Sequence, residues 1–364
     1  MSTIMKASHQ WATRPDDQRF VSLLALDEFC RAQQDHSIGR VVESRSLQAV
    51  PVEGDNKALV VVGPGGREAV PTHWSFGQLS QLVKAPPSYL RDLPTPLVAD
   101  LLNYGLQCTR ERDDIGVLLY KNGGPSELRA VTGPNYGRVW NSQITSALVN
   151  HFGDGLTGDF RVPGEFGKAV EVTKSNTTLY ASDRDMFVFL ADERNRIEIP
   201  NRRNGEKGSL ARGFFVWNSE VGKMSFGVAM FLFDYVCCNR IVWGAEGYTE
   251  IRFNHTISAP SRWVEEVKPA ILAYAEASEA PIQKAIAAAQ KAKLVDVDDF
   301  LKQRFSGAQT SAIKSVHMTE EGRPIETMWD ATTAITAYAR QLTHQDARID
   351  MERVAGKILD KVAA

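Results

Sequence analysis

The sequence predicts an α+β fold: an antiparallel, hairpin-rich sheet with packed helices and a helical C-terminal third. Three observations support this prediction. Short apolar runs separated by glycine-containing turns fill the middle of the chain, which is typical of β-hairpins. The segment 213–244 is the most apolar and aromatic of the chain, so it belongs in a core. From residue 261 onward alanine becomes frequent and apolar residues recur three or four apart, which indicates helices.

Residues 1–45 are expected to be an N-terminal lead-in that carries one helix. The run VSLLALDEFCRAQ has helical apolar spacing, and the residues predicted to face inward are Leu23, Leu24, Leu26 and Phe29. The polar start lacks the apolar region of a secretion signal. No apolar stretch approaches the ~20 residues that a membrane span needs. We therefore expect no contact with a membrane.

Residues 46–258 are expected to form the α+β core. Its first half predicts a strand over 40–52 and a short buried strand over 57–62, closed by Gly63-Pro64-Gly65-Gly66. That tetrapeptide lacks the glycine spacing and the GK[ST] ending of a phosphate-binding loop, so we interpret it as a hairpin turn. The helices predicted by apolar spacing cover 72–82, 97–106 and 141–150, and a short one opens at 88. The strands 116–120 and 128–132 flank Asn122-Gly123-Gly124, a strong hairpin signal.

The second half of the core contains the central apolar segment. Paired strands are predicted over 178–181 and 186–191, and the polar run 194–212 is either an exposed loop or a long hairpin. Two strands then meet at a turn over residues 218–222. The apolar run that follows, 228–242, is too long for one ordinary strand, so it must bend or become helical. A last strand is predicted over 249–257.

Residues 259–364 are expected to form the helical C-terminal region. Its clearest helix covers 326–342, with Pro324 at a first-turn position where proline is tolerated. The residues that define its spacing fall alternately three and four apart: Ile325, Met328, Thr332, Ile335, Ala339 and Leu342. A final helix is predicted over 350–362.

The composition excludes several classes of protein. With 43% apolar and 24% charged residues, the chain of 364 residues has the composition of a soluble globular protein. The formal net charge of -2 excludes a basic surface overall, so any contact with nucleic acid has to be local. The four cysteines are Cys30, Cys108, Cys237 and Cys238. Their spacing fits neither a zinc site nor a disulfide, which favours a reducing cytoplasm. The sequence predicts no metal site and no cofactor.

The strongest candidate for a binding site is a basic segment next to aromatic residues. Guanidinium groups hold phosphates, and flat rings stack on the bases of single-stranded nucleic acid whatever their sequence. The candidate nucleic-acid-binding residues are Arg194, Arg196, Arg202, Arg203, Lys207, Arg212, Phe215 and Trp217. The same segment also fits a solvated loop that enters a hydrophobic strand, whose side chains alternate between two faces. The sequence leaves both interpretations open.

The sequence carries no positive motif for an enzyme. Four carboxylates flank the strand predicted over 186–191: Asp183, Asp185, Asp192 and Glu193. They are compatible with a Mg²⁺ site or with turn capping. No two of the seven histidines lie three or four apart on a predicted helix, and no GxSxG motif is present. We therefore assign no catalytic residue.

Three groups of residues resemble the phage- and plasmid-borne family called phage/plasmid-like proteins, a domain of unknown function. The first group is Arg129-Ala130-Val131-Thr132 with Asn135-Tyr136-Gly137 and Asn141. The second runs from Asn218-Ser219-Glu220-Val221-Gly222-Lys223 to Val236-Cys237-Cys238-Asn239. The third is Trp329-Asp330-Ala331-Thr332-Thr333-Ala334-Ile335-Thr336-Ala337-Tyr338. The chain departs from the family at Arg240, where a small residue is common, and at Thr333, where asparagine is common.

The resemblance covers about residues 115–345 and implies a role in DNA metabolism, because members of the family sit in mobile elements among DNA-metabolism genes. More loosely, the chain is similar to the phage single-strand annealing recombinases. Their cores are a hairpin-rich sheet backed by a helix, and they assemble into rings.

Together these observations lead to the expectation of a non-enzymatic phage or plasmid protein that binds single-stranded DNA and anneals it in recombination. Because one modest basic segment binds weakly, assembly into a homo-oligomer would supply avidity. We expect it in the cytoplasm of the bacterial host. Two alternatives stay open: an interaction protein that inhibits a host defence or replication factor through the helix region 329–342, and a metal-dependent nuclease that uses Asp183, Asp185 and Asp192.

Overall fold

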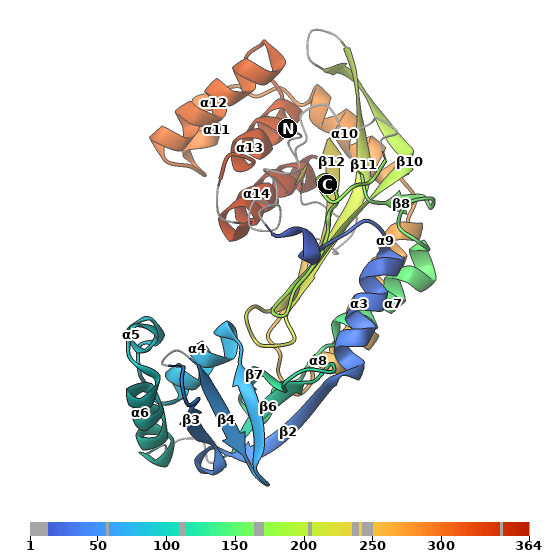
Figure 1. Ribbon diagram of the computed structural model, residues 1–364. Coiled ribbons are helices and arrows are strands. Elements are labelled where there is room, and N and C mark those ends of the chain that lie inside the picture. The colour runs from blue at the N-terminus through green and yellow to red at the C-terminus, as the bar shows by residue number, and fades with distance from the viewer. Residues whose placement is uncertain are drawn as a thin grey trace.

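The computed structural model describes residues 14–55, 58–108, 114–163, 171–202, 206–234, 240–241, 250–342 and 345–363. Within these residues the chain has two mostly antiparallel sheets, with helices between them and at the C-terminal end. The predicted α+β class is therefore confirmed. An eight-stranded sheet runs through the centre of the described structure, and a six-stranded sheet forms a lobe at one end (Figure 1).

The lobe consists of the six-stranded sheet and three helices. In the order β2-β6-β7-β5-β4-β3 its strands are antiparallel except for the pair β5 and β7. Their bounds are β2 Ser37–Glu43, β3 Gln48–Pro51, β4 Leu59–Gly63, β5 Arg67–Pro71, β6 Asp114–Tyr120 and β7 Glu127–Thr132. The helices are α4 His73–Leu82, α5 Pro87–Asp92 and α6 Thr95–Cys108. The Gly63-Pro64-Gly65-Gly66 turn joins β4 to β5 as a plain hairpin, as predicted.

The larger sheet is built on two consecutive hairpins. Its strands are β1 Arg19–Phe20, β8 Phe160–Arg161, β9 Leu179–Ala181, β10 Met186–Arg202, β11 Glu206–Asn218, β12 Phe226–Asp234, β13 Arg240–Ile241 and β14 Glu250–Phe253. The main order is β1-β9-β10-β11-β12-β13, with β14 paired to β12 and β8 to β10. Of the two structures predicted for 194–212, the long hairpin is correct, because β10 and β11 pair along their whole length with register shifts. The predicted turn over 218–222 joins β11 to β12.

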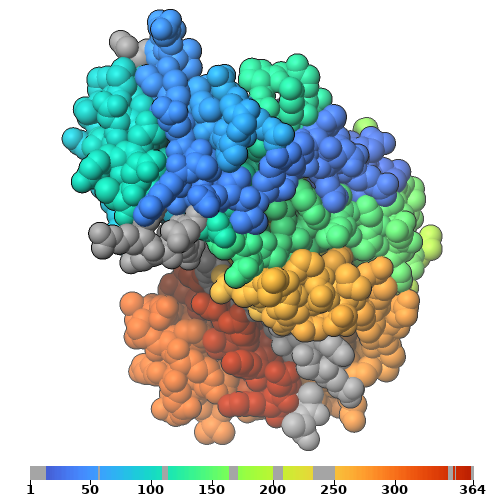
Figure 2. Space-filling model, turned by 90° about the horizontal axis from the view of Figure 1, so that it is seen from below, coloured from blue at the N-terminus to red at the C-terminus, as the bar shows by residue number. Residues whose placement is uncertain are grey.

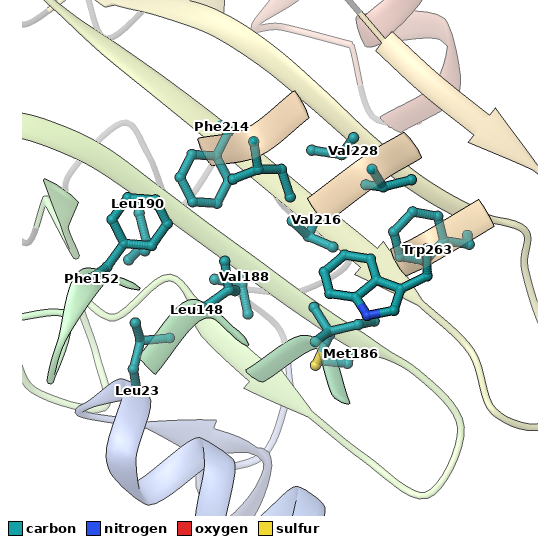
Figure 3. Close-up of a cluster of buried hydrophobic side chains, with 14 of the residues drawn as sticks. Leu23, Leu148, Phe152, Met186, Val188, Leu190, Phe214, Val216, Val228 and Trp263 are labelled. Atoms are coloured by element: carbon teal, nitrogen blue, oxygen red, sulfur yellow. The ribbon is translucent and has the colours of Figure 1, made fainter. Parts of the chain in front are cut away.

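One face of the larger sheet packs against α3 Leu23–Asp35, α7 Asn141–Phe152, α8 Ala259–Arg262 and α9 Lys268–Glu276. Alternate residues at the start of β10 and at the end of β11 face these helices, including Val188, Leu190 and Phe214, as Figure 3 shows. The side chain of Ser22 caps α3 by accepting a hydrogen bond from the backbone N–H of Ala25. Leu24 is about half exposed, so its predicted inward position is wrong, whereas Leu23 lies in the core.

The opposite face of the same strands is a cluster of buried aromatic residues. Its largest members are Tyr180, Phe187, Phe189, Phe215, Trp217 and Phe231. Neighbouring rings tilt against one another, with centroids 5.5 Å apart for the pair Phe215 and Trp217. Such ring pairs add to the stabilisation that burial of their area gives.

Replacing Gly227 by alanine is expected to lower the free energy of unfolding by about 1–3 kcal/mol, because it overpacks this cluster. Gly227 pairs with Trp217 across the β11–β12 ladder, and a Cβ atom on Gly227 would lie 1.9 Å from Cζ2 of the indole. Denaturant unfolding of the purified variants measures the change. Gly124→Ala is the control, since a Cβ there meets nothing within 4 Å. Equal midpoints for the two variants would contradict the packing.

The C-terminal helices pack at the end of the β10–β11 hairpin that is distant from the lobe. They are α10 Ala280–Lys291, α11 Val297–Lys302, α12 Gly307–Glu321, α13 Met328–Ala339 and α14 Gln345–Ala363. In Figure 2 the lobe, blue to teal, and these helices, orange to red, occupy opposite ends of the visible face. The helix α13 begins after Thr327, whose side chain accepts a hydrogen bond from the backbone N–H of Asp330. Pro324 therefore precedes the helix and is not in its first turn.

The two sheets do not follow the segment bounds predicted for the N-terminal two thirds of the chain. The strand β2 lies in the segment 1–45 yet pairs with β6 of the lobe. The segment 46–258 is divided between both sheets. The apolar run 228–242 ends its first strand at Asp234, and its cysteines, Cys237 and Cys238, lie outside the described residues. None of the helices in the described residues combines the length and apolar composition of a membrane span.

Candidate nucleic-acid interface

The two arginines at the start of the predicted basic segment lie on β10 and pair with carboxylates. Arg194 is 72% exposed, and its Nη1 lies 3.0 Å from Oδ1 of Asp159. Arg196 donates to the carboxylate and the carbonyl oxygen of Glu193. An exposed ion pair exchanges its partner readily, so Arg194 remains able to reach a phosphate.

Arg212 is a core residue, which corrects its predicted role in nucleic-acid binding. Its guanidinium donates to the carbonyl oxygens of Tyr274 and Ala277. It also lies 3.3 Å from Oδ2 of Asp192 and 3.7 Å from Oε1 of Glu279. Burying a charge is costly unless it is paired, and here the acids of two elements neutralise it. Arg212 fastens α9 to the sheet.

The two predicted stacking residues are also buried. Phe215 is 0% exposed and Trp217 is 9% exposed, because both belong to the aromatic cluster on the second face of the larger sheet. The prediction that these rings stack on bases is therefore wrong for this conformation. Arg202 and Lys207 lie on β10 and β11, and Arg203 lies outside the described residues. The side chains of all three lie outside the described part of the structure.

The acids of the proposed nuclease do not converge. Asp183 and Asp185 lie just before β10, whereas Asp192 lies seven positions further along that strand, about 23 Å at about 3.3 Å per residue. Asp183 pairs with Arg184, and Glu193 lies beside Asp192 and pairs with Arg196. In the part of the chain that the structure describes, no cluster of three or more His, Cys, Asp or Glu side chains is placed to hold a metal ion.

The proposed protein-docking helix is buried. In α13 the side chains from Trp329 to Ala337 are all enclosed by neighbouring elements, among them α10, α12 and α14. The carboxylate of Asp330 is held by Arg323 and by the backbone N–H groups of Glu326 and Thr327. These contacts explain the third resembling motif as a packing and capping element. The helix therefore offers a partner little more than the partly buried side chains at its two ends, Met328 and Tyr338.

The first two resembling motifs meet where the lobe joins the larger sheet. The centre of this contact is the turn over residues 218–223. Its Glu220 is 1% exposed, and Oε2 lies 3.1 Å from Nη2 of Arg129 on β7. The other carboxylate oxygen accepts the backbone N–H of Asn141 at 2.8 Å, at the start of α7. Arg138 donates to the Glu220 carbonyl oxygen at 2.8 Å.

The rest of the turn is held by hydrogen bonds from the same segments. The hydroxyl of Tyr136 donates to the carbonyl oxygen of Ser219 at 2.7 Å. On α4, the side chains of Trp74 and Gln78 both donate to the carbonyl oxygen of Val221. Gly222 takes a positive φ of 78°, which glycine adopts without strain. The hydrogen bonds that hold this turn therefore come from residues that are far apart in the sequence.

Cations outnumber carboxylates around this turn. In the described residues the cationic side chains that bind it or lie next to it are Arg14, Arg91, Arg129, Arg138, Arg184, Lys223 and Arg252. The carboxylates that pair with them are Asp183, Asp185 and Glu220. Seven cationic side chains therefore gather at this turn, and three carboxylates pair with them. We call this set, with residues 218–223, the cationic joint.

Two of these cations are exposed and lack a carboxylate partner in the described residues. Arg91 of α5 donates to the carbonyl oxygen of His73, and Arg252 of β14 donates to the hydroxyl of Ser225. Partial burial and the charges of Arg91 and Arg184 lower the pKa of His73, so this imidazole adds no further charge at neutral pH. Asp185 is shared by Lys223 and Arg14, each 2.6 Å from Oδ2.

The comparisons identify no relative: no protein-family description, curated protein or solved structure matches this chain. The resemblance to the phage and plasmid family therefore stays a prediction. Its motifs were nevertheless the one sequence signal that pointed to the cationic joint, since they include Arg129, residues 218–223 and Asn141, whose backbone N–H donates to Glu220. Arg91 and Arg252 carry no such signal.

Proposed function

We propose that this chain binds single-stranded DNA at the cationic joint. The observation that carries the proposal is the gathering of seven cationic side chains, two of them exposed and without a carboxylate partner in the described residues, at one place on a chain whose formal net charge is -2. A local field of this kind attracts a phosphate backbone even when the whole protein is slightly acidic. Of the cations in the sequence-predicted segment whose side chains are described, Arg194, Arg196 and Arg212 each face a carboxylate.

Single strands are favoured over duplexes by the side chains beside the joint. Arg91 lies on α5, the helix that also carries the exposed ring of Tyr89. A cation next to an exposed aromatic ring suits an unpaired strand, whose bases are free to stack. The resemblance to phage annealing proteins supports the same class of ligand. Annealing and assembly into rings follow from that resemblance alone and are part of the proposal.

The test is a titration of a labelled oligo-dT at several salt concentrations. For single strands the slope of log K against log salt changes by about 0.7 for each phosphate contact. The double variant Arg91→Ala/Arg252→Ala is expected to bind more weakly and to lose about 1.4 from that slope. Lys284→Ala removes an exposed cation on α10, away from the joint, and is the matched control.

Two outcomes would count against the proposal. Binding by the wild-type protein that is absent or indifferent to salt would remove DNA as the ligand. Salt-dependent binding that is reduced by Arg194→Ala and unchanged in the double variant would return the interface to the β10–β11 hairpin.

A further inference from the structure

A cavity of about 830 Å³ opens in the lobe beside the cationic joint. Its walls come from the three helices α4, α5 and α6 and from the adjoining parts of β6 and β7. The apolar side chains that line it are Leu82, Val83, Leu90, Leu101, Ile115 and Val131. Pockets of this size and character hold small-molecule ligands.

Two exposed tyrosines form part of the wall. Tyr89 on α5 is 59% exposed and Tyr104 on α6 is 73% exposed. In the described residues neither ring stacks on another ring or makes a side-chain hydrogen bond. Large aromatic side chains that are exposed around an apolar cavity indicate a ligand-binding or interaction surface.

The cavity shares a wall with the cationic joint. Gln78 lines the cavity and donates to Val221 of the turn. Thr132 also lines it, and its Cγ2 lies 3.7 Å from the place that a Cβ on Gly222 would take. Leu90 lies in the wall directly before Arg91. When the phosphates of a polymer lie at the joint, the groups attached to neighbouring phosphates can therefore reach the cavity.

We propose that this cavity receives a base of the single strand bound at the cationic joint; the inference rests on the function proposed above. A flat apolar ring fits between the cavity floor and the rings of Tyr89 and Tyr104, where stacking is independent of base identity. The exposed amide of Gln81 supplies one donor group and one acceptor to the edge of the base. Gln78 contributes no such contact, because its amide is already bound to Val221 and Val131.

The experiment compares two oligonucleotides of equal length, oligo-dT and an abasic strand with the same phosphates. Wild-type protein is expected to bind oligo-dT more tightly than the abasic strand. The variant Tyr89→Ala/Tyr104→Ala is expected to bind oligo-dT at least about fivefold more weakly and the abasic strand unchanged. Tyr89→Phe/Tyr104→Phe keeps both rings and should retain the affinity. Met318→Ala, a truncation on the exposed side of α12, controls for loss of apolar surface.

Each result decides a separate question. Unchanged oligo-dT binding by the alanine variant, or equal loss for both strands, would refute the base-binding cavity while leaving the cationic joint intact. Failure of wild-type protein to bind either strand would refute the interface itself. As a second measurement, ultraviolet cross-linking of an oligonucleotide containing 4-thiothymine is expected to modify peptides that contain Tyr89 or Tyr104. Cross-links confined to other helices would overturn the assignment.

Discussion

Replacing Glu220 by alanine is expected to lower the free energy of unfolding by about 3–5 kcal/mol, the cost of leaving a buried charge unpaired. The partner left behind is Arg129, which is 3% exposed and would keep only the Ser37 hydroxyl and the Asp183 carbonyl as acceptors. The backbone N–H of Asn141 would lose its acceptor as well. Urea unfolding monitored by tryptophan fluorescence and circular dichroism measures the loss.

An exposed ion pair of the same joint provides the control. Asp183→Ala removes the partner of Arg184, and both side chains of that pair are partly open to water. Such pairs contribute about 0–1 kcal/mol, so this variant should unfold close to the wild-type midpoint. Glu220→Gln keeps an acceptor for Asn141 and should fall between the two. A loss below about 1 kcal/mol in Glu220→Ala would show that the lobe is not fastened through this carboxylate.

Lowering the pH from 7 to 4.5 is expected to remove about 2 kcal/mol of stability through His255 alone. Burial, opposed by the bond to Gly137 and aided by the charge of Arg138, lowers the pKa of His255 from 6.5 to about 4. Between about pH 4 and pH 6.5 His255 is protonated in the unfolded chain and neutral in the folded chain. Stability therefore falls as the pH drops through 6.5 and reaches its full loss below about 4.

The geometry around this ring explains why it stays neutral. Its Nδ1 lies 3.2 Å from the carbonyl oxygen of Gly137, which only accepts, so Nδ1 carries the proton. The ring stacks on Tyr136 with centroids 4.9 Å apart, and Nε2 is buried without a partner in the described residues. His255→Asn keeps a donor for Gly137 and does not titrate. Its unfolding free energy should change less between pH 7 and 4.5 than that of the wild-type protein; equal changes would contradict the assignment.

Local signals predicted most helices and hairpins because they act over a few residues. The serine before α3, the glycines between β4 and β5, and the asparagine–glycine turn between β6 and β7 each fix their own backbone. The start of α13 was misplaced because Thr327 competes with Pro324, and the reciprocal cap with Asp330 decides in favour of Thr327.

The candidate site was predicted less well, because burial depends on which elements pack together. Arg212 and Trp217 look like binding residues when they are considered as neighbours of other arginines and aromatics. The acids that neutralise Arg212, Asp192 and Glu279, lie 20 and 67 positions away along the chain. Because side chains alternate along a strand, the sequence shows that Phe214 and Trp217 lie on opposite faces of the sheet. It does not show that both of these faces are buried in the folded protein.

By itself the sequence determined the class of fold, the hairpins and the helical C-terminal third, since periodicity and turn chemistry are local properties. It also held the resembling motifs that include Arg129, Asn141 and Glu220. Only the tertiary structure decided that these three meet at one turn, and that Arg91 and Arg252 lie beside it without a carboxylate partner among the described residues. The physical reason is that a charge is defined by its neighbours in space: whether it is neutralised, buried or free for a ligand depends on residues that folding alone brings together.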